Sequence, residues 1–346
     1  MKTINSITIR KDDVISILIL VFLWILFGFN TKTADSENYR FFYEALKDTN
    51  YVFGLEPGFA LFMRVSNKLK LNYTQFLCLY SFIGLCFFWN YIKRYSRNTP
   101  IVVFLYGLFP YFFQIIQIRF FMSSMISLWS FHFLIEKKKK YIFNFVLFIF
   151  IATLFHVTAI FYLLMLLTLL PWNKIIKYEM IIMIICLLIL ILGISIVSHF
   201  IPKILIYVNG EKHTRFATKL FFLFFYFSLS YIIISLKKHK REYNRKFDDF
   251  ACKSLVISII YYVFIWFSMD FTRPLETVFI NYYLLIINTY HFKQNIYSRK
   301  NELSVSFVYS ILFLIGTIYI LVFLFSAHQV FGIFNNNNFI PQLLGA

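Results

Sequence analysis

Charged residues and cysteines are scarce in this sequence, and both shortages limit the classes of protein to which it can belong. Asp, Glu, Lys and Arg together make up only 14% of the 346 residues, whereas 60% are hydrophobic. A soluble domain is excluded, because it could not cover so much apolar surface. The four cysteines lie in or beside apolar runs and form no CxxC pair. We therefore predict neither a thiol metal site nor a disulfide framework.

Motifs for nucleotides, metals and common hydrolytic nucleophiles are also missing. The sequence contains no Walker loop, no GxGxxG, no HExxH and no GxSxG, each of which would indicate a specific chemistry. Its nearest approaches to a DxD motif are Asp12-Asp13 and Asp248-Asp249, both in segments that the charge pattern places in the cytoplasm. The sequence therefore disfavours a metal-dependent nucleotide-sugar transferase, and we expect no metal and no cofactor.

Long apolar runs dominate what is present. Many of them approach or exceed the roughly 20 residues that cross a bilayer as a helix. Basic residues cluster in the short segments between the runs, which is the positive-inside pattern. The net charge of +18 therefore reports topology and predicts no nucleic-acid partner. We predict an all-α polytopic membrane protein, with residues 1–346 as a single integral membrane domain.

The charge pattern predicts about eleven crossings, with ten and twelve as bounds, the amino end inside and the carboxyl end outside. Residues 30–72 form an outer loop after the first crossing, and residues 237–250 form a basic cytoplasmic loop. Within the outer loop, Phe59–Leu69 is too short and too charged to cross, so we expect an interfacial or re-entrant helix with Pro57 in its first turn. Apart from residues 141–170, the predicted crossings are residues 14–29, 73–90, 101–113, 120–135, 179–200, 217–236, 251–269, 275–290 and 303–325.

The apolar run Tyr141–Leu170 is 30 residues long and has basic residues on both flanks. If both flanks are inside, the run contains two crossings of about 14 residues, or roughly 21 Å each. We prefer this hairpin, which places His156 at its turn. One long tilted helix is the alternative, and it would put the most basic loop outside.

Arg119 is the most unusual residue in the sequence, because long apolar runs lie before and after it. A guanidinium at the centre of a bilayer costs about 2.5–3.5 kcal/mol on insertion scales. Such a residue usually faces protein or a water-filled cavity and is a functional-site hypothesis by default. The alternative is an arginine at a helix end that reaches the headgroups.

A set of polar residues shares the outer side of the predicted topology. The set is Asp35, Glu56, Arg64, Arg119, His156, Arg215, Asp270 and Arg273. Arginine forms bidentate, charge-assisted hydrogen bonds to phosphate oxygens, so four arginines on one face suit a diphosphate. A carboxylate or histidine beside them suits a general base that acts on a hydroxyl.

Each member also has an ordinary structural explanation, and the sequence leaves it open. The alternatives are solvated loop charges for Asp35, Arg64 and Arg215, a helix-terminal charge for Glu56, a hydrogen-bonded core residue for His156, and a mutual ion pair for Asp270 and Arg273. That all of these residues are predicted on the outer side of the membrane favours a functional site more strongly than any single residue does.

Several segments, taken in order, resemble the EpsG family of bacterial membrane proteins, which is grouped with Wzy-type polysaccharide polymerases. The matching segments are Thr33–Tyr39, Glu56-Pro57-Gly58-Phe59, Ile118-Arg119-Phe120, Leu154–Ala159 and Asp270–Arg273. Family members often have glutamine where Phe120 stands, and residues 331–341 match the family's carboxyl end only loosely.

The resemblance implies a glycosyltransferase that polymerises polysaccharide at the outer face of the bacterial cytoplasmic membrane, with a GT-C-like fold as one candidate. The growing glycan would pass from undecaprenyl diphosphate to the next lipid-linked repeat unit, for exopolysaccharide, capsule or O-antigen. Membrane lipid, a flippase and a chain-length regulator are candidate partners. We assign Arg119, Arg273, Arg64 and Arg215 to the diphosphate, Glu56, Asp35 or His156 to the base, and Gln117, Asp270 and Tyr39 to support.

Two other classes of protein remain as alternatives. A flippase or transporter of the lipid-linked sugar would spread its charges across the membrane depth, whereas here they gather outside. A membrane O-acyltransferase acting on polysaccharide also uses an intramembrane histidine, and a cytoplasmic His156 would favour it.

Overall fold

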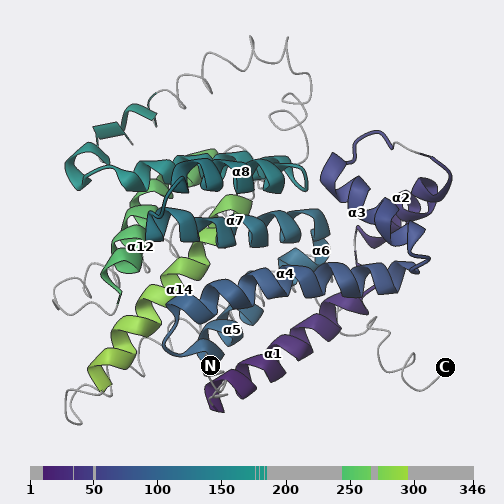
Figure 1. The fold of residues 1–346 in the computed structure, drawn as a ribbon, viewed down its shortest axis with the longest axis horizontal. Coiled ribbons are helices and arrows are strands. Elements are labelled where there is room, and N and C mark those ends of the chain that lie inside the picture. Colours follow the sequence, from purple (N-terminus) through teal and green to yellow (C-terminus); the bar gives the residue numbers. More distant parts are fainter. Residues whose placement is uncertain are drawn as a thin grey trace, which may run out of the picture.

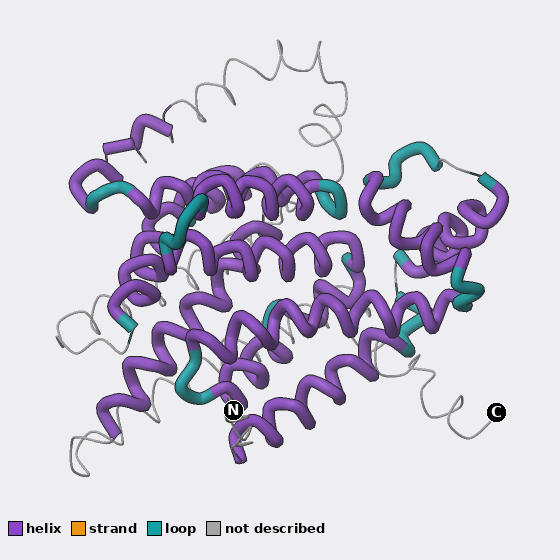
Figure 2. The backbone as a smooth tube through the Cα atoms, viewed as in Figure 1, coloured by secondary structure: helices purple, strands orange, loops and turns teal. Residues whose placement is uncertain are grey.

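The computed structural model describes residues 11–33, 35–49, 52–175, 177–178, 180–182, 184, 244–265 and 272–294. The regular structure of these residues is helical, with loops and turns between the helices, and no strand occurs among them (Figures 1 and 2). The elements are α1 (Lys11–Gly28), α2 (Ser36–Asp48), α3 (Pro57–Lys68), α4 (Tyr73–Tyr95), α5 (Thr99–Leu108), α6 (Tyr111–Ile116), α7 (Ile118–Glu136), α8 (Tyr141–Thr153), the 3₁₀ helix η1 (Val157–Leu169), α12 (Arg245–Ile257), α13 (Ile259–Ile265) and α14 (Thr272–Gln294).

Helix α7 lies at the centre of the described bundle. It packs against α4 on one side and α8 on the other, and it also contacts α6, η1, α12 and α14 (Figure 1). Ser123, Ser124, Ser127 and Ser130 are all fully buried on α7. Small side chains allow neighbouring helices to approach closely inside a membrane bundle. The α7 sequence thus suits a helix surrounded by other helices.

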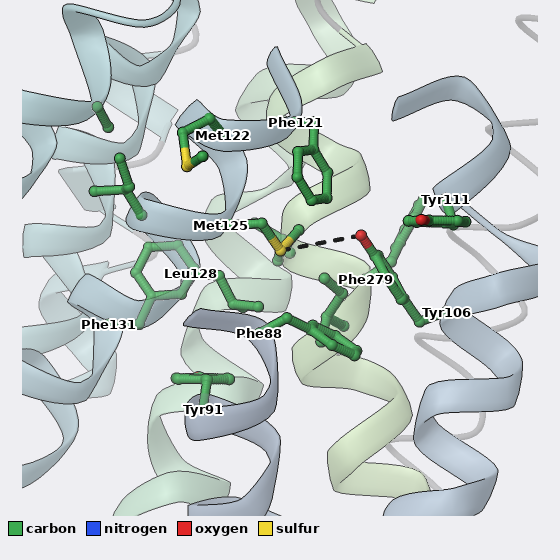
Figure 3. Packing of buried hydrophobic residues seen from close by; sticks show 14 of the residues in the cluster. Phe88, Tyr91, Tyr106, Tyr111, Phe121, Met122, Met125, Leu128, Phe131 and Phe279 are labelled. Carbon is green, nitrogen blue, oxygen red and sulfur yellow. Dashed lines mark hydrogen bonds between the residues drawn. The ribbon is translucent and has the colours of Figure 1, made fainter. Parts of the chain in front are cut away.

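Aromatic side chains fill the space between α4, α5, α7 and α14. Figure 3 shows Phe88, Tyr106, Phe121, Met125 and Phe279 packed together, and the rings of Phe88 and Tyr106 stack with centroids 4.1 Å apart. The Tyr106 hydroxyl lies 4.0 Å from the Met125 sulfur. This core holds α7 against α14, and the two arginines of the site described below, Arg119 and Arg273, lie at the amino-terminal ends of these two helices.

Two described helices, α4 and α7, are long and apolar enough to cross a membrane, and α5, α8 and η1 are shorter apolar helices. The all-helical prediction is confirmed for the described residues. Helix α4 begins with a capping box, in which the side chains of Asn72 and Gln75 each accept from the other's backbone N–H. The predicted crossings at residues 217–236 and 303–325 lie outside the described ranges, as do residues 179–200 apart from 180–182 and 184.

The first part of the predicted outer loop, residues 30–72, contains a helix that we did not predict, α2. Tyr39, Tyr43 and Leu46 are buried at spacings of four and three residues, which is one face of a helix. Glu37 in the first turn and Lys47 in the last complement the helix dipole. Helix α2 packs against α3, and the two lie together at one end of the bundle (Figure 1).

The predicted crossing at residues 101–113 is divided between two helices. Helix α5 ends at Leu108 and α6 begins at Tyr111. Pro110 stands between them, and its missing N–H and ring interrupt a continuous helix. A second interruption at Gln117 separates α6 from α7. The chain therefore changes direction just before Arg119.

The hairpin predicted at His156 is present. Helix α8 ends at Thr153, η1 begins at Val157, and the two helices pack against each other. His156 is the N-cap residue of η1, with extended backbone angles. The alternative of one continuous helix through residues 141–170 is therefore wrong.

The basic segment at residues 237–250 was predicted to be a loop, but α12 begins inside it at Arg245. The side chain of Asn244 accepts a hydrogen bond from the Phe247 backbone N–H, which caps the helix. The predicted crossing at residues 251–269 is divided between α12 and α13. Helix α14 begins at Thr272, so Arg273 lies in its first turn.

Candidate functional site

Arg119 and Glu56 form a partly buried ion pair at the end of the bundle that carries α2 and α3. The Nη1 atom of Arg119 lies 2.5 Å from Oε2 of Glu56, and the two side chains are 26% and 18% exposed. The guanidinium carbon lies 5.7 Å from the centroid of the Tyr39 ring. Arg119 is the second residue of α7, so the interruption at Gln117 brings it to the start of that helix.

Helix α3 presents Glu56, and a close backbone contact fixes where α3 begins. Glu56 is the N-cap residue, Pro57 opens the first turn as predicted, and the Gly58 N–H donates to the Leu154 carbonyl oxygen at 2.8 Å. A Cβ atom on Gly58 would lie 2.8 Å from both Cβ and O of Leu154. The Glu-Pro-Gly-Phe segment is thus attached directly to the turn that holds His156.

Arg273 and His156 form the second half of the site. Nη1 of Arg273 lies 3.0 Å from Nε2 of His156, and Nε of Arg273 donates to Oε1 of Gln117 at 2.8 Å. His156 is buried, and its Nδ1 lies 2.7 Å from Oγ1 of Thr158. The ring of Phe120 meets the imidazole edge-on at 5.8 Å.

Electrostatics join the two halves of the site. His156 lies in the turn, outside the helices, and burial lowers its pKa, with the positive charges of Arg273 and Arg119 adding to the effect. Burial raises the pKa of Tyr39 in α2, although Arg119 and, more weakly, Arg273 oppose the change. Both arginines therefore act on the same neutral imidazole and on the same phenol.

The structure brings together Glu56, Arg119, His156, Arg273, Gln117 and Tyr39. Asp35 is the N-cap residue of α2, one turn before Tyr39, and its side chain does not cap the helix. Arg64 is half-buried on α3, two turns beyond Glu56. Asp270 and Arg215 lie outside the described residues.

Sequence reasoning missed Glu276, which is 1% exposed and lies one helical turn after Arg273. The Thr272 hydroxyl lies 3.5 Å from its Oε1, and its Oε2 has no hydrogen-bond partner within the described part of the chain. A signal was available, because an ionisable residue inside an apolar run is a functional-site hypothesis by default. Thr158 was also missed, and its contact with His156 could not be read from the sequence.

This arrangement suits an anionic ligand with several oxygens. Two guanidinium groups from different helices converge beside one carboxylate and one neutral imidazole. Arginine donates to phosphate oxygens in pairs, and a neutral imidazole or a carboxylate accepts a proton from a hydroxyl.

Comparison with known proteins agrees with the sequence resemblance. No curated protein and no solved structure matches the chain. The EpsG family matches residues 13–341, which is nearly the whole sequence. The residues that form the site, from Tyr39 to Arg273, all fall within the matched range. The chain therefore belongs to the EpsG family.

Proposed function

We propose that this protein is a multi-pass glycosyltransferase of the bacterial cytoplasmic membrane that polymerises polysaccharide at the outer face. Membership of the EpsG family supports polysaccharide polymerisation in general. The substrate we assign is a glycan on undecaprenyl diphosphate, which is transferred to a second lipid-linked repeat unit. A flippase and a chain-length regulator are the candidate protein partners for this role.

One observation carries the assignment: Arg273 contacts His156 directly, and Arg119, from a different helix, lies close enough for its charge to act on the same imidazole. A diphosphate leaving group gains negative charge as its bond to the sugar breaks. Fixed cations stabilise such charge where it develops, and removal of one such donor typically costs about 10²–10³ in rate. Guanidinium groups supply this charge without a metal.

The reaction forms one bond and breaks one bond. A hydroxyl oxygen of the acceptor sugar attacks the anomeric carbon of the donor, and the bond from that carbon to the diphosphate oxygen breaks. The electron pair remains on the diphosphate, which the arginines hold, and the hydroxyl proton passes to a base. Glu56 and His156 directly contact the two arginines, so they are stronger candidates for the base than Asp35.

The test replaces Arg119 in cells that depend on this gene for their surface polysaccharide. We expect Arg119→Ala to abolish long chains, and Arg119→Lys to reduce them strongly, because lysine cannot present a planar fork to phosphate oxygens. Single repeat units on lipid should accumulate outside the membrane. The glycan is measured by gel electrophoresis, and the lipid-linked unit by mass spectrometry.

Arg40 supplies the matched control, because it is an exposed arginine on α2 over the Tyr73 ring. Arg40→Lys should leave chain length unchanged. Normal polysaccharide from an Arg119→Ala protein at its usual level would contradict the proposal. Accumulation of the lipid-linked unit on the inner side would instead indicate a flippase.

A further inference from the structure

We propose that a cavity between α1 and α4 holds the isoprenoid chain of the lipid-linked substrate while the diphosphate of the same molecule lies at Arg119. This α1–α4 cavity has a volume of about 620 Å³, which is within the range of sites that bind small molecules. The inference rests on the proposed function, and it adds a binding site for the lipid part of that substrate.

The lining of the α1–α4 cavity is largely apolar. Its main side chains come from the carboxyl end of α1, the segment between α3 and α4, and α4 itself, and they are Trp24, Phe29, Leu69, Leu71, Leu79 and Phe82. No Asp, Glu, Lys or Arg is among the described residues that line it. Asn72 and Gln75 also line it, but their side-chain oxygens are used in the capping box of α4. The cavity therefore suits a hydrocarbon chain and offers little to a sugar or a phosphate.

A close contact between α1 and α4 forms one wall of the cavity. Nε1 of Trp24 donates to the Cys78 carbonyl oxygen at 2.8 Å, and a Cβ atom on Gly28 would lie 2.7 Å from Sγ of Cys78. The ring of Trp24 also meets the ring of Phe29 edge-on, with centroids 6.3 Å apart. Because these contacts hold the wall within the protein itself, a chain enters a cavity that is already formed.

The cavity opens on the outer surface of the bundle. Leu69 is 62% exposed and Phe82 is 55% exposed, although both also line the cavity. Helix α4 is long and apolar enough to cross a membrane, so an exposed phenylalanine within it faces lipid. A lipid can therefore place its chain in the cavity from the side, without leaving the bilayer.

The cavity and the ion pair of the candidate site flank the same turn of α4. Leu79 lines the cavity, whereas the next residue, Tyr80, packs against Phe59 of α3 with ring centroids 5.5 Å apart. The charges of Glu56 and Arg119 act on the Tyr80 hydroxyl. A helix with its side chains is about 10–12 Å across. An undecaprenyl chain is much longer than this distance, so one molecule can reach both places.

Occupation of both places by one molecule identifies the ligand as an isoprenoid diphosphate rather than a bilayer phospholipid. The chain is in an apolar medium before and after it enters, so van der Waals packing, and not the hydrophobic effect, favours the cavity. We therefore expect the cavity to orient the lipid more than to tighten its binding, and we expect severalfold effects.

The experiment uses the purified full-length protein in nanodiscs of phosphatidylglycerol and phosphatidylethanolamine. The probe is geranylgeranyl diphosphate with a diazirine at the far end of its chain, and mass spectrometry locates the label after irradiation. We expect label on residues 69–82 and 24–29. Excess undecaprenyl phosphate should reduce this label severalfold, whereas hexadecyl phosphate should not. Equal competition by the two lipids would indicate a general site for acyl chains and would overturn the inference.

Thr74, which is half-buried in the lining, allows the cavity to be filled. Thr74→Trp should reduce the label severalfold. Val146→Trp is the matched control, because Val146 is exposed on α8 away from the cavity lining, and it should leave the label unchanged. Melting temperatures check that both variants are folded. Label of equal strength on the exposed residues Phe143 and Phe150 of α8 would contradict a specific site.

Arg119→Ala separates this inference from the proposed function. It should weaken labelling by the diphosphate probe but not labelling by the corresponding photoreactive geranylgeraniol, which has no phosphate. If Arg119→Ala cells still make normal polymer while the cavity is labelled, the proposed function fails and the isoprenoid site stands. If Arg119→Ala abolishes polymer while the label is scattered over the lipid-facing surface, the proposed function stands and the isoprenoid site fails.

Discussion

Gly58 is the residue at which two of the most recognisable sequence segments meet. It stands in Glu-Pro-Gly-Phe, and its N–H binds the carbonyl of Leu154, two residues before His156. The sequence alone identified both segments, but it could not show that they touch, because nothing in local periodicity reports a contact between residues 58 and 154. The requirement for glycine here comes from close packing.

Gly58→Ala should therefore impair the site. The added Cβ would lie 2.8 Å from Leu154 backbone and side-chain atoms, which cannot both move aside cheaply. We expect a loss of about 1–3 kcal/mol in stability, as for other overpacked sites, and a strong loss of polymer. Thermal unfolding and glycan analysis measure the two effects.

Gly107→Ala is the matched control. Its Cβ would meet the flexible Leu23 side chain at 3.3 Å, so a small adjustment should accommodate it. Equal effects of the two substitutions would show that the contact between Gly58 and Leu154 has no special role.

At the scale of elements, charged residues at the ends of apolar runs predicted where helices turn. The polar residues within a segment were a poorer guide to whether that segment is a helix or a loop. The basic flanks of residues 141–170 predicted the hairpin at His156, and the start of α3 at Pro57 followed from its sequence. Helix α2 was missed, because polar residues alternate with its buried Tyr39 and Tyr43 and disguise an amphipathic helix as a loop. The convergence of α7 and α14 is a long-range contact that no local pattern contains.

Helix α14 carries a polar face among its buried residues, and Glu276 is its ionisable member. Thr277 accepts from the Tyr162 hydroxyl, and Asn281 accepts from the Tyr91 hydroxyl at 2.6 Å. Two buried atoms of this face, Oε2 of Glu276 and Nδ2 of Asn281, have no hydrogen-bond partner within the described ranges. A buried polar atom without a hydrogen-bond partner costs about 1–3 kcal/mol of stability, so the presence of this carboxyl group indicates a role beside Arg273.

Glu276→Leu should therefore stabilise the protein or leave its melting temperature unchanged, while activity falls. Glu276→Gln keeps the shape of the side chain and removes the ionisable group, so it should also lower activity. The measurements are thermal unfolding in detergent and polymer length in cells. A fully active Glu276→Leu variant would show that the carboxylate has no part in the reaction.

At the scale of the whole molecule, cysteine labelling can test the prediction that the site faces the outside of the membrane. A variant without native cysteines allows single cysteines to be placed at Phe53, which is 80% exposed beside the site, and at Lys138, which is exposed between α7 and α8. We expect an impermeant maleimide to label Phe53→Cys in intact cells. Lys138→Cys should react only after the membrane is opened.

The reverse labelling pattern would place the arginines in the cytoplasm and exclude polymerisation at the outer face. It would favour the O-acyltransferase alternative, for which a cytoplasmic His156 is expected. A matched pair of cysteines at exposed Lys68 and Lys139 checks each side independently.

The hydrogen bond from Gly58 to Leu154 has a mechanical consequence. Helices α2 and α3 pack together at one end of the bundle, and this bond joins them to the turn that holds His156. The bond joins backbone atoms, so a displacement of α3 would also displace the backbone at Leu154, two residues before His156. The positions of α3 and of the imidazole are therefore coupled through a single backbone contact.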